Sequence, residues 1–394
     1  MENRTKGMTL CLLGGITFLA NGDNLAAAAL LSDIAKDLGL SISTAAFSVT
    51  SYMMAFGLFT LLFGPLADRY GKAKVVNMAA IGTAVFSMLG ALAYDLPSLV
   101  FLRAMNGLFG AGIIPVSIAL VGEMYNDSER QKAIGKVLGI AFLGGAMATA
   151  IGGAIAYFGS WRLVYFAYGV AEFILAMVML KVLKKDKSVT RQLNIWGSYK
   201  LALSNKRFLR KVSVIFFIGF AILGSFTFSG VSIMERTGLN VFNVGLVLSL
   251  YGVGTVLGGR IAPYLRKILK NGFLVSAGFL GFIALSILAY TNVLGWQAVG
   301  LLGFGITFIF LQSTLLATLQ EELRQMKGTV MSLASFNLFL GAAMGTQVNG
   351  YLMERYGASS VFSLASYIVM GVGIGAAILV ASYETRKKAA LKNL

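Results

Sequence analysis

The sequence predicts an all-α membrane protein with twelve transmembrane helices. Of its 394 residues, 57% are hydrophobic and only 12% are charged, with a mean hydropathy of +0.78. A soluble domain carries roughly twice that share of charged residues. Apolar runs near the twenty-residue length of a membrane-crossing helix recur along the chain. The bilayer core offers no water to pair with backbone groups, and a helix pairs its own N–H and C=O groups. The apolar runs therefore favour a bundle of helices.

Short polar loops separate the apolar runs, and the first run follows the tail MENRTKG directly. That run is too long for a cleavable signal peptide, and we expect it to remain in the protein as the first span. The twelve spans are expected at about 8–30, 45–66, 74–94, 98–122, 133–157, 162–183, 212–234, 243–265, 272–291, 295–319, 328–351 and 358–382.

The basic residues are distributed unequally between the two sides of the predicted membrane. The chain has 33 Lys and Arg residues against 16 Asp and Glu, a net charge of +17. All but five lie in the tails and in loops on the side of the N-terminal tail; the exceptions are Lys36, Arg103, Arg162, Arg236 and Arg355. This positive-inside pattern predicts that both termini are cytoplasmic, in a bacterial cytoplasmic membrane. It explains the basic charge by topology rather than by nucleic-acid binding.

A polar, basic segment divides the chain nearly in half. We expect a first bundle at 1–183, a cytoplasmic linker at 184–211 and a second bundle at 212–394. An internal repeat supports this division, because LGGAMATAIGG from Leu143 aligns without gaps with LGAAMGTQVNG from Leu340. Both segments are stripes of small residues that permit close helix packing.

The stretch GPLADRYGKAK is the charged cluster between the second and third apolar runs. Its residue types suit a tight cytoplasmic turn between two membrane helices. The string resembles the signature loop between helices 2 and 3 of the major facilitator superfamily, and Ala73 departs from a position that is usually basic. The matching residues, which this resemblance marks as gating residues, are Gly64, Asp68, Arg69, Gly71 and Lys72.

The resemblance implies two pseudo-symmetric six-helix bundles that alternate access to a substrate site near the midplane. The compact twelve-helix form resembles the drug:proton antiporters and small-molecule exporters. Those antiporters usually carry Gly-Pro before the Gly-Gly of helix 5, where this chain has Ala148 and Thr149. The segment GGRIAPYLRKILK from Gly258 resembles a second copy of the signature that keeps its basic residues and loses the Asp.

Three ionisable residues inside the predicted spans are candidates for proton coupling, because charges at membrane depth are costly. Asp23 in helix 1 and Arg103 in helix 4 lie at a similar depth, roughly 10 Å from the outer face. We expect them to pair, either as a proton-coupling site or as a static ion pair. Glu172 in helix 6 has no evident partner and is a candidate second protonation site. Asn106, which follows Arg103, resembles the superfamily's helix 4 pattern, where Gln is common.

The remaining candidates are a gating acid and cavity linings. Glu123, at the cytoplasmic end of helix 4, is expected to pair with Arg69 or Lys72 and latch the gate, or else to be a solvated acid. Amides and aromatic rings that share helix faces are expected to line an apolar substrate cavity, although such rings also pack simply against neighbours. The set is Asn21, Asn24, Asn106, Phe220, Phe304, Phe308, Gln312 and Asn337.

These features predict a secondary transporter, a proton-coupled exporter of small amphipathic or drug-like molecules of the multidrug-efflux kind. The alternatives are a proton-coupled symporter or uniporter of polar solutes, and a lipid-handling or receptor protein on the same scaffold. No P-loop, catalytic triad or metal cluster is evident, and with one Cys and no His we expect neither enzymatic activity nor a cofactor. The expected partners are a small molecule, protons and the lipid bilayer, with the chain acting as a monomer.

Overall fold

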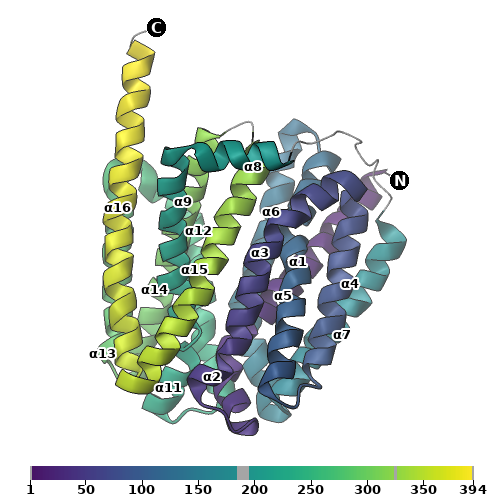
Figure 1. Cartoon of the computed structure of the whole chain (residues 1–394), viewed down its shortest axis with the longest axis vertical. Helices are drawn as coiled ribbons and strands as arrows, with labels where there is room; N and C mark the ends of the chain where they lie inside the picture. Colours follow the sequence, from purple (N-terminus) through teal and green to yellow (C-terminus); the bar gives the residue numbers. More distant parts are fainter. Residues whose placement is uncertain (1, 184–194, 324–325, 393–394) are drawn as a thin grey trace.

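The computed structural model describes residues 2–183, 195–323 and 326–392 (Figure 1). Within those residues every regular element is a helix. Twelve spans are long and apolar enough to cross a membrane. The predicted fold class, an all-α membrane protein with twelve transmembrane helices, is therefore confirmed.

The helices follow one another in two sets of six spans. The first set is α1 (Glu2–Asp37), α2 (Ile42–Ala45) continued by α3 (Phe47–Tyr70), α4 (Lys72–Gly90), α5 (Leu96–Met124), α6 (Asp127–Phe158) and α7 (Trp161–Val182). The second set begins with a broken span, α9 (Lys206–Ile218), η1 (Gly219–Leu223), α10 (Gly224–Phe226) and α11 (Ser229–Thr237). It continues with α12 (Val241–Leu269), the short η2 (Lys270–Gly272), α13 (Phe273–Tyr290), α14 (Leu294–Glu322), α15 (Lys327–Tyr356) and α16 (Ala358–Lys392).

Local sequence explains where several helices begin and end. Asp95 caps α5 by accepting a hydrogen bond from the backbone N–H of Ser98 at 2.9 Å, and Ser98 Oγ lies 3.2 Å from the Asp95 backbone nitrogen. These hydrogen bonds lower the pKa of Asp95. Gly71 joins α3 to α4 with a φ of 92°, a conformation that favours glycine. Asp68 does not cap α4 at this junction and instead pairs with Lys72.

Helix α1 extends further than the sequence suggested. It remains helical to Asp37, beyond the expected end near residue 30. Asp23 therefore lies near the middle of this span, Lys6–Asp37, rather than near its outer end. The polar residues of the last two turns continue the helix because the exposed end of a helix tolerates charge.

The two sets of six helices repeat the same close contacts. A Cβ on Gly144 of α6 would lie 2.2 Å from the carbonyl oxygen of Phe18 in α1. A Cβ on Gly341 of α15, its counterpart in the sequence repeat, would lie 2.0 Å from the carbonyl oxygen of Phe216 in α9. The repeated glycines thus let the fifth helix of each set approach the first helix backbone to backbone.

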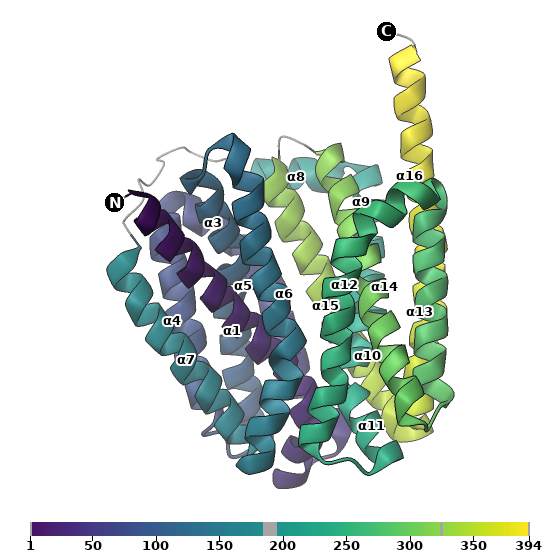
Figure 2. The ribbon, with the colours of Figure 1, turned by 180° about the vertical axis from the view of Figure 1, so that it is seen from behind.

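Two long helix pairs join the two sets. Helix α3 lies beside α15 (Figure 1), and α6 lies beside α12 (Figure 2). In each pair, the second span of one set packs against the fifth span of the other. Gly252 of α12 meets Ala146 of α6, and Gly57 of α3 meets Phe339 of α15. Both ends of the chain lie at the same end of the bundle (Figure 1), which we call the terminal face.

The predicted linker, 184–211, is described only in part, since 184–194 lie outside the described residues. Its later portion forms α8 (Ile195–Ser204), which runs across the terminal face (Figure 1). The Tyr199 hydroxyl donates a hydrogen bond to the carbonyl oxygen of Leu61 at 2.8 Å, which ties α8 to α3. The seventh span begins at Lys206, earlier than the expected residue 212.

Candidate functional site

A buried ion pair lies inside the first six-helix set. Arg103 Nη1 of α5 is 3.3 Å from Asp23 Oδ1 of α1. The two side chains are only 2% and 1% exposed. A charge pair so removed from water has a large desolvation cost, and breaking it by removing one partner is strongly destabilising. The structure therefore brings together the two residues that the sequence singled out.

Aromatic rings enclose the Arg103 guanidinium. Its Cζ lies 4.5 Å from the ring centre of Tyr52 in α3 and 4.9 Å from that of Tyr165 in α7. Asn106, one turn further along α5, accepts from Arg103 Nη1 at 3.2 Å and donates to the carbonyl oxygen of Thr83 in α4 at 3.1 Å. Cation–π contacts and these hydrogen bonds orient the guanidinium toward α1.

A second carboxyl group lies in the same interior. Glu172 of α7 is completely buried, and neither of its oxygens has a hydrogen-bond partner among the described residues. It is close enough to Asp23 and Arg103 to interact with both electrostatically. Desolvation disfavours an ionised carboxylate in such surroundings. We call the following residues the charge cluster: Asp23, Tyr52, Arg103, Asn106, Tyr165, Tyr168 and Glu172.

Three tyrosines of the charge cluster were not among the residues singled out in the sequence. Tyr52, Tyr165 and Tyr168 are buried, and the hydroxyl groups of the latter two have no hydrogen-bond partner in the described chain. Tyr168 packs against Gly22, next to Asp23. The signal for two of them was present, because Tyr165, Tyr168 and Glu172 share one helix face by their spacing. Tyr52 could not be identified in this way, since it comes from a different helix.

The predicted gating residues meet at the terminal face. Lys72 Nζ of α4 lies 3.3 Å from Asp68 Oδ1 of α3 and 2.8 Å from Glu123 Oε1 of α5. Of the two partners considered for Glu123, the structure places Lys72 beside it. Arg69 is exposed and lies over the Tyr70 ring, 5.2 Å from its centre. Gly64 lies on the face of α3 toward α15, where a Cβ would approach Ser332 at 3.9 Å.

The predicted cavity-lining amides of the first set are mostly engaged with protein atoms. Asn21 donates to the carbonyl oxygen of Ala141 in α6 at 2.8 Å. Asn24 is buried, and its side-chain oxygen has no partner among the described residues. The amide of Asn106 belongs to the charge cluster. Among the described residues, Asn24 is therefore the buried amide of these three whose oxygen lacks a partner.

The predicted aromatic residues of the second set form a layered cluster. The Phe304 ring lies 5.2 Å from the ring centre of Tyr251, and the Phe308 ring lies 6.2 Å from it. Phe226 stacks on Tyr251 with ring centres 4.2 Å apart and lies 6.4 Å from Phe304. Phe304 is completely buried while Phe308 is partly exposed, so only the edge of this cluster is accessible.

The last predicted lining residues come from three different elements, η1, α14 and α15. Phe220 is in the π-helical turn η1, with its ring 6.4 Å from that of Phe216. Asn337 donates to the carbonyl oxygen of Leu333 in its own helix. Gln312 is partly buried in α14. Helices η1 and α15 pack backbone to backbone around Gly219 and Leu338, which places the segments of Phe220 and Asn337 side by side.

The chemistry available to this arrangement is proton binding rather than covalent catalysis. Across the described ranges no three Cys, Asp or Glu side chains come together in a way that suits a metal ion. The charge cluster instead holds two carboxyl groups and one guanidinium in a water-poor interior. A twelve-span bundle built from two similar halves is a membrane-transporter architecture.

The chain belongs to the Major Facilitator Superfamily, whose sequence profile matches residues 12–346. It is therefore a non-enzymatic, multi-pass membrane transporter. Its fold is similar to that of a bacterial homologue of the human lysosomal transporter Spinster, with a TM-score of 0.77 and 15% identity over 98% of both chains. A nucleoside transporter structure is similar at a TM-score of 0.76, with 15% identity over 96% of this chain and 99% of that one.

The relatives with similar sequences are named for different substrates, and they include resistance proteins and a sugar-acid transporter. A bicyclomycin resistance protein homologue of Haemophilus influenzae is 24% identical over 86% of this chain and 88% of its own length. Multidrug resistance protein 3 of Bacillus subtilis is 23% identical over 95% of this chain and 84% of its own length. The hexuronate transporter of Bacillus subtilis is 26% identical over 94% of this chain and 92% of its own length.

Proposed function

We propose that this transporter exports small amphipathic or drug-like molecules in exchange for protons, with the charge cluster as its proton-binding site. The protein acts as a monomer by alternating access between the two six-helix sets. The protein lies in the cell membrane with both termini on the cytoplasmic side, as the distribution of basic residues indicates. The names of two full-length relatives, both resistance proteins, support export over uptake.

The charge balance of the cluster supports proton binding. With both carboxylates ionised, Asp23 and Glu172 give two negative charges against the single positive charge of Arg103. A buried cluster avoids an uncompensated charge when one of the carboxyl groups holds a proton. The cluster thus accommodates one proton, and the proton and Arg103 exchange between the two carboxyl groups when the helices around them move.

One helix connects this cluster to the second half, and this connection is the observation that carries the proposal. The ring of Tyr52 in α3 packs on Arg103. On the same helix Met53 Sδ lies 3.9 Å from the Thr346 hydroxyl, and the Thr50 hydroxyl lies 2.6 Å from Gln347 Nε2, both in α15. If Arg103 shifts between its carboxyl partners, the packed Tyr52 ring is displaced and α3 moves with it. Helix α3 forms part of the interface that must rearrange during alternating access.

The gate lies at the terminal end of the same helix. Lys72 links Asp68 of α3 to Glu123 of α5 across the Gly71 junction. The two acids are half exposed while the Lys72 side chain is only 11% exposed, so Lys72 stays in place and its acidic partners can be exchanged. We infer that they set the preferred state of the terminal face, with Gly64, Arg69 and Gly71 shaping the turn.

Asn24, Phe220, Phe308, Gln312 and Asn337 are our candidates for substrate contacts. Each is partly exposed or carries a polar atom that is not fully used, which suits an apolar site with a few amides. We assign Asn21, Asn106 and Phe304 a supporting role, because they are occupied by contacts within their own halves.

A second candidate is the proton-coupled uptake of a polar solute on the same fold. The full-length similarity to a hexuronate transporter favours it. The buried cluster serves either direction of transport, since coupling depends on proton exchange and not on the chemistry of the substrate.

The test uses purified protein in liposomes with an imposed pH gradient and an internal pH dye. Lipophilic cations, neutral drugs and sugars are added in turn to the wild type, to Asp23→Asn and to the matched control Asp33→Asn on the same helix. Exchange predicts proton movement opposite to substrate flux, abolished by Asp23→Asn and retained by Asp33→Asn.

Two other results would lead to different functions. Proton movement in the same direction as a sugar would replace export by uptake. Substrate flux without proton movement, unchanged by Asp23→Asn, would reject coupling and leave the Asp23–Arg103 pair a structural contact.

A further inference from the structure

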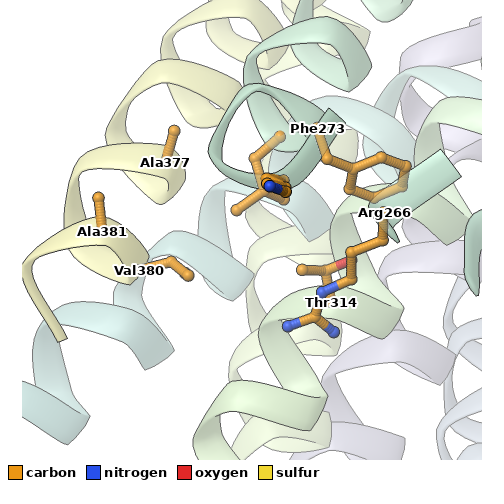
Figure 3. A pocket seen from close by; sticks show the side chains of 8 residues that line it. Arg266, Phe273, Thr314, Ala377, Val380 and Ala381 are labelled. Carbon is orange, nitrogen blue, oxygen red and sulfur yellow. The ribbon is translucent and has the colours of Figure 1, made fainter. Parts of the chain in front are cut away.

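A hollow with basic and apolar walls lies between α12, α13, α14 and α16, near the terminal face (Figure 3). Its enclosed volume is only about 20 Å³, room for a water-sized group, so a larger ligand would lie against its lining residues rather than inside it. A second, more open hollow of about 390 Å³ adjoins it and shares Arg266 and Thr314 with it. Neither hollow involves the charge cluster or the gate, so neither is explained by proton-coupled transport.

The walls of the first hollow combine two kinds of surface. Arg266 and Lys270 supply positive charge and Thr314 supplies a hydroxyl group. In Figure 3 the Arg266 side chain extends toward Thr314, while Val380 and its neighbours on α16 form the opposite wall. The apolar lining residues are Phe273, Leu274, Ala377, Val380 and Ala381. Such a surface suits an anion that also carries hydrocarbon.

The hollow lies at the depth of the membrane boundary. The span of α12 ends at Leu269 and that of α13 begins at Phe273, on either side of the short turn that carries Lys270. On the same stretch of α12, Tyr264 and Ile268 are exposed, as expected for side chains that face lipid. Phosphate groups of a bilayer lie at this level, above the acyl chains that contact the spans.

The basic residues here have no acidic partner within the described part of the chain. The first half offers a comparison, because its equivalent turn neutralises Lys72 with Asp68 and Glu123. Aligned on Gly64 and Gly259, the second copy has Pro263 where the first has Asp68. Glu322, the last residue of α14, forms an ion pair with Lys211 of α9, with Oε2 and Nζ 2.6 Å apart. Arg266, Lys267 and Lys270 thus face the hollows without a carboxylate.

Favourable interaction with the helix dipole accounts for basic residues in the last turn of α12, but not for the apolar walls beside them. We propose that the hollow binds an anionic phospholipid of the leaflet at the terminal face. Arg266 and Lys270 bind the phosphate, the Thr314 hydroxyl donates to it, and Phe273, Leu274 and Val380 contact the first part of an acyl chain. The second hollow, with Lys267, accommodates the remainder of a larger headgroup.

The test is native mass spectrometry of the detergent-purified full chain, titrated with phosphatidylglycerol, cardiolipin or phosphatidylcholine. The double variant Arg266→Ala/Lys270→Ala is expected to weaken binding of the two anionic lipids roughly tenfold or more, since each basic residue contributes about 1 kcal/mol. The matched control Lys132→Ala/Lys136→Ala removes the same charge from α6, where both residues are exposed, and is expected to bind as the wild type does.

Val380→Trp tests the hollow separately, because it fills the apolar wall and keeps every charge. It is expected to weaken binding of the anionic lipids as well, and thermal unfolding checks that each variant is folded. Equal weakening in the two charge variants would show general electrostatic attraction and overturn the proposal, as would unchanged binding in Arg266→Ala/Lys270→Ala. Displacement of the lipid by glycerol phosphate at low excess would show a headgroup-only anion site and would also reject a lipid site.

Discussion

Gly230 of α11 and Ala28 of α1 meet backbone to backbone. A Cβ on Gly230 would lie 2.3 Å from the carbonyl oxygen of Ala28 and 3.4 Å from the Cα of Ala29. The contact joins the seventh span to the first, and so joins one half to the other. Backbone cannot move aside as a flexible side chain does, so the close approach depends on the absence of a side chain at position 230.

Gly230→Val is expected to lower transport roughly tenfold, because the overpacking costs about 1–3 kcal/mol and favours states in which the halves are apart. The measurement is substrate flux in liposomes at equal protein content. Gly371→Val on α16 is the control, since a Cβ there meets no atom within 4 Å. If both variants transport at the wild-type rate, the contact between α1 and α11 does not limit the cycle.

Removing Arg103 is expected to destabilise the protein strongly. Arg103→Leu leaves Asp23 buried beside a second carboxyl group, and the loss of one partner of a buried pair costs about 3–5 kcal/mol. The double variant Asp23→Leu/Arg103→Leu removes both charges and is expected to regain most of the lost thermal stability while remaining unable to couple protons. Recovery of proton-coupled flux in the double variant would assign the pair a purely structural role.

Much of the fold was predictable because membrane spans are local features. Length and hydropathy alone indicate a helix, and the twelve spans of the structure correspond to the twelve apolar runs. Boundaries were less accurate: α1 continues to Asp37 through residues whose polarity suggested a loop. The broken seventh span, with a π-helical turn at Gly219–Leu223, gave no hydropathy signal, because every residue there is apolar or Gly.

Only the ionisable residues of the site could be predicted, because charged side chains are rare within the apolar spans. Asp23, Arg103 and Glu172 stand out in apolar surroundings, and matched depth suggested the first two as partners. The sequence did not indicate that Glu172 would share their interior, since that depends on how α7 packs against α1 and α5. Nor did it reveal that Asn106 and Phe304 would be fully buried, because helix spacing places a residue on a face without identifying what that face meets.

Glu172→Gln is expected to leave thermal stability nearly unchanged, because the amide has the shape of a protonated carboxyl group and Glu172 has no hydrogen-bond partner among the described residues to lose. The number of protons moved per substrate molecule is expected to fall or to lose its dependence on pH. Flux and proton movement measured together from pH 5.5 to about 8.5 separate these effects. An unchanged proton ratio at every pH would show that Asp23 alone carries the proton.

The ion pairs of Lys72 are expected to matter for the transport cycle more than for stability. Lys72→Ala removes ion pairs with two half-exposed acids, whose loss should change the free energy of unfolding by less than about 1 kcal/mol, and the lost packing of the buried Lys72 stem adds to that change. Transport should fall roughly five- to tenfold, because the same contacts bias the equilibrium between open and closed terminal faces. Lys74→Ala is the matched control: it removes the same charge from an exposed position two residues further along α4, where the side chain only approaches the Tyr70 ring. Equal loss of transport in both variants would assign the effect to the positive charge of the turn rather than to a gate built on Lys72.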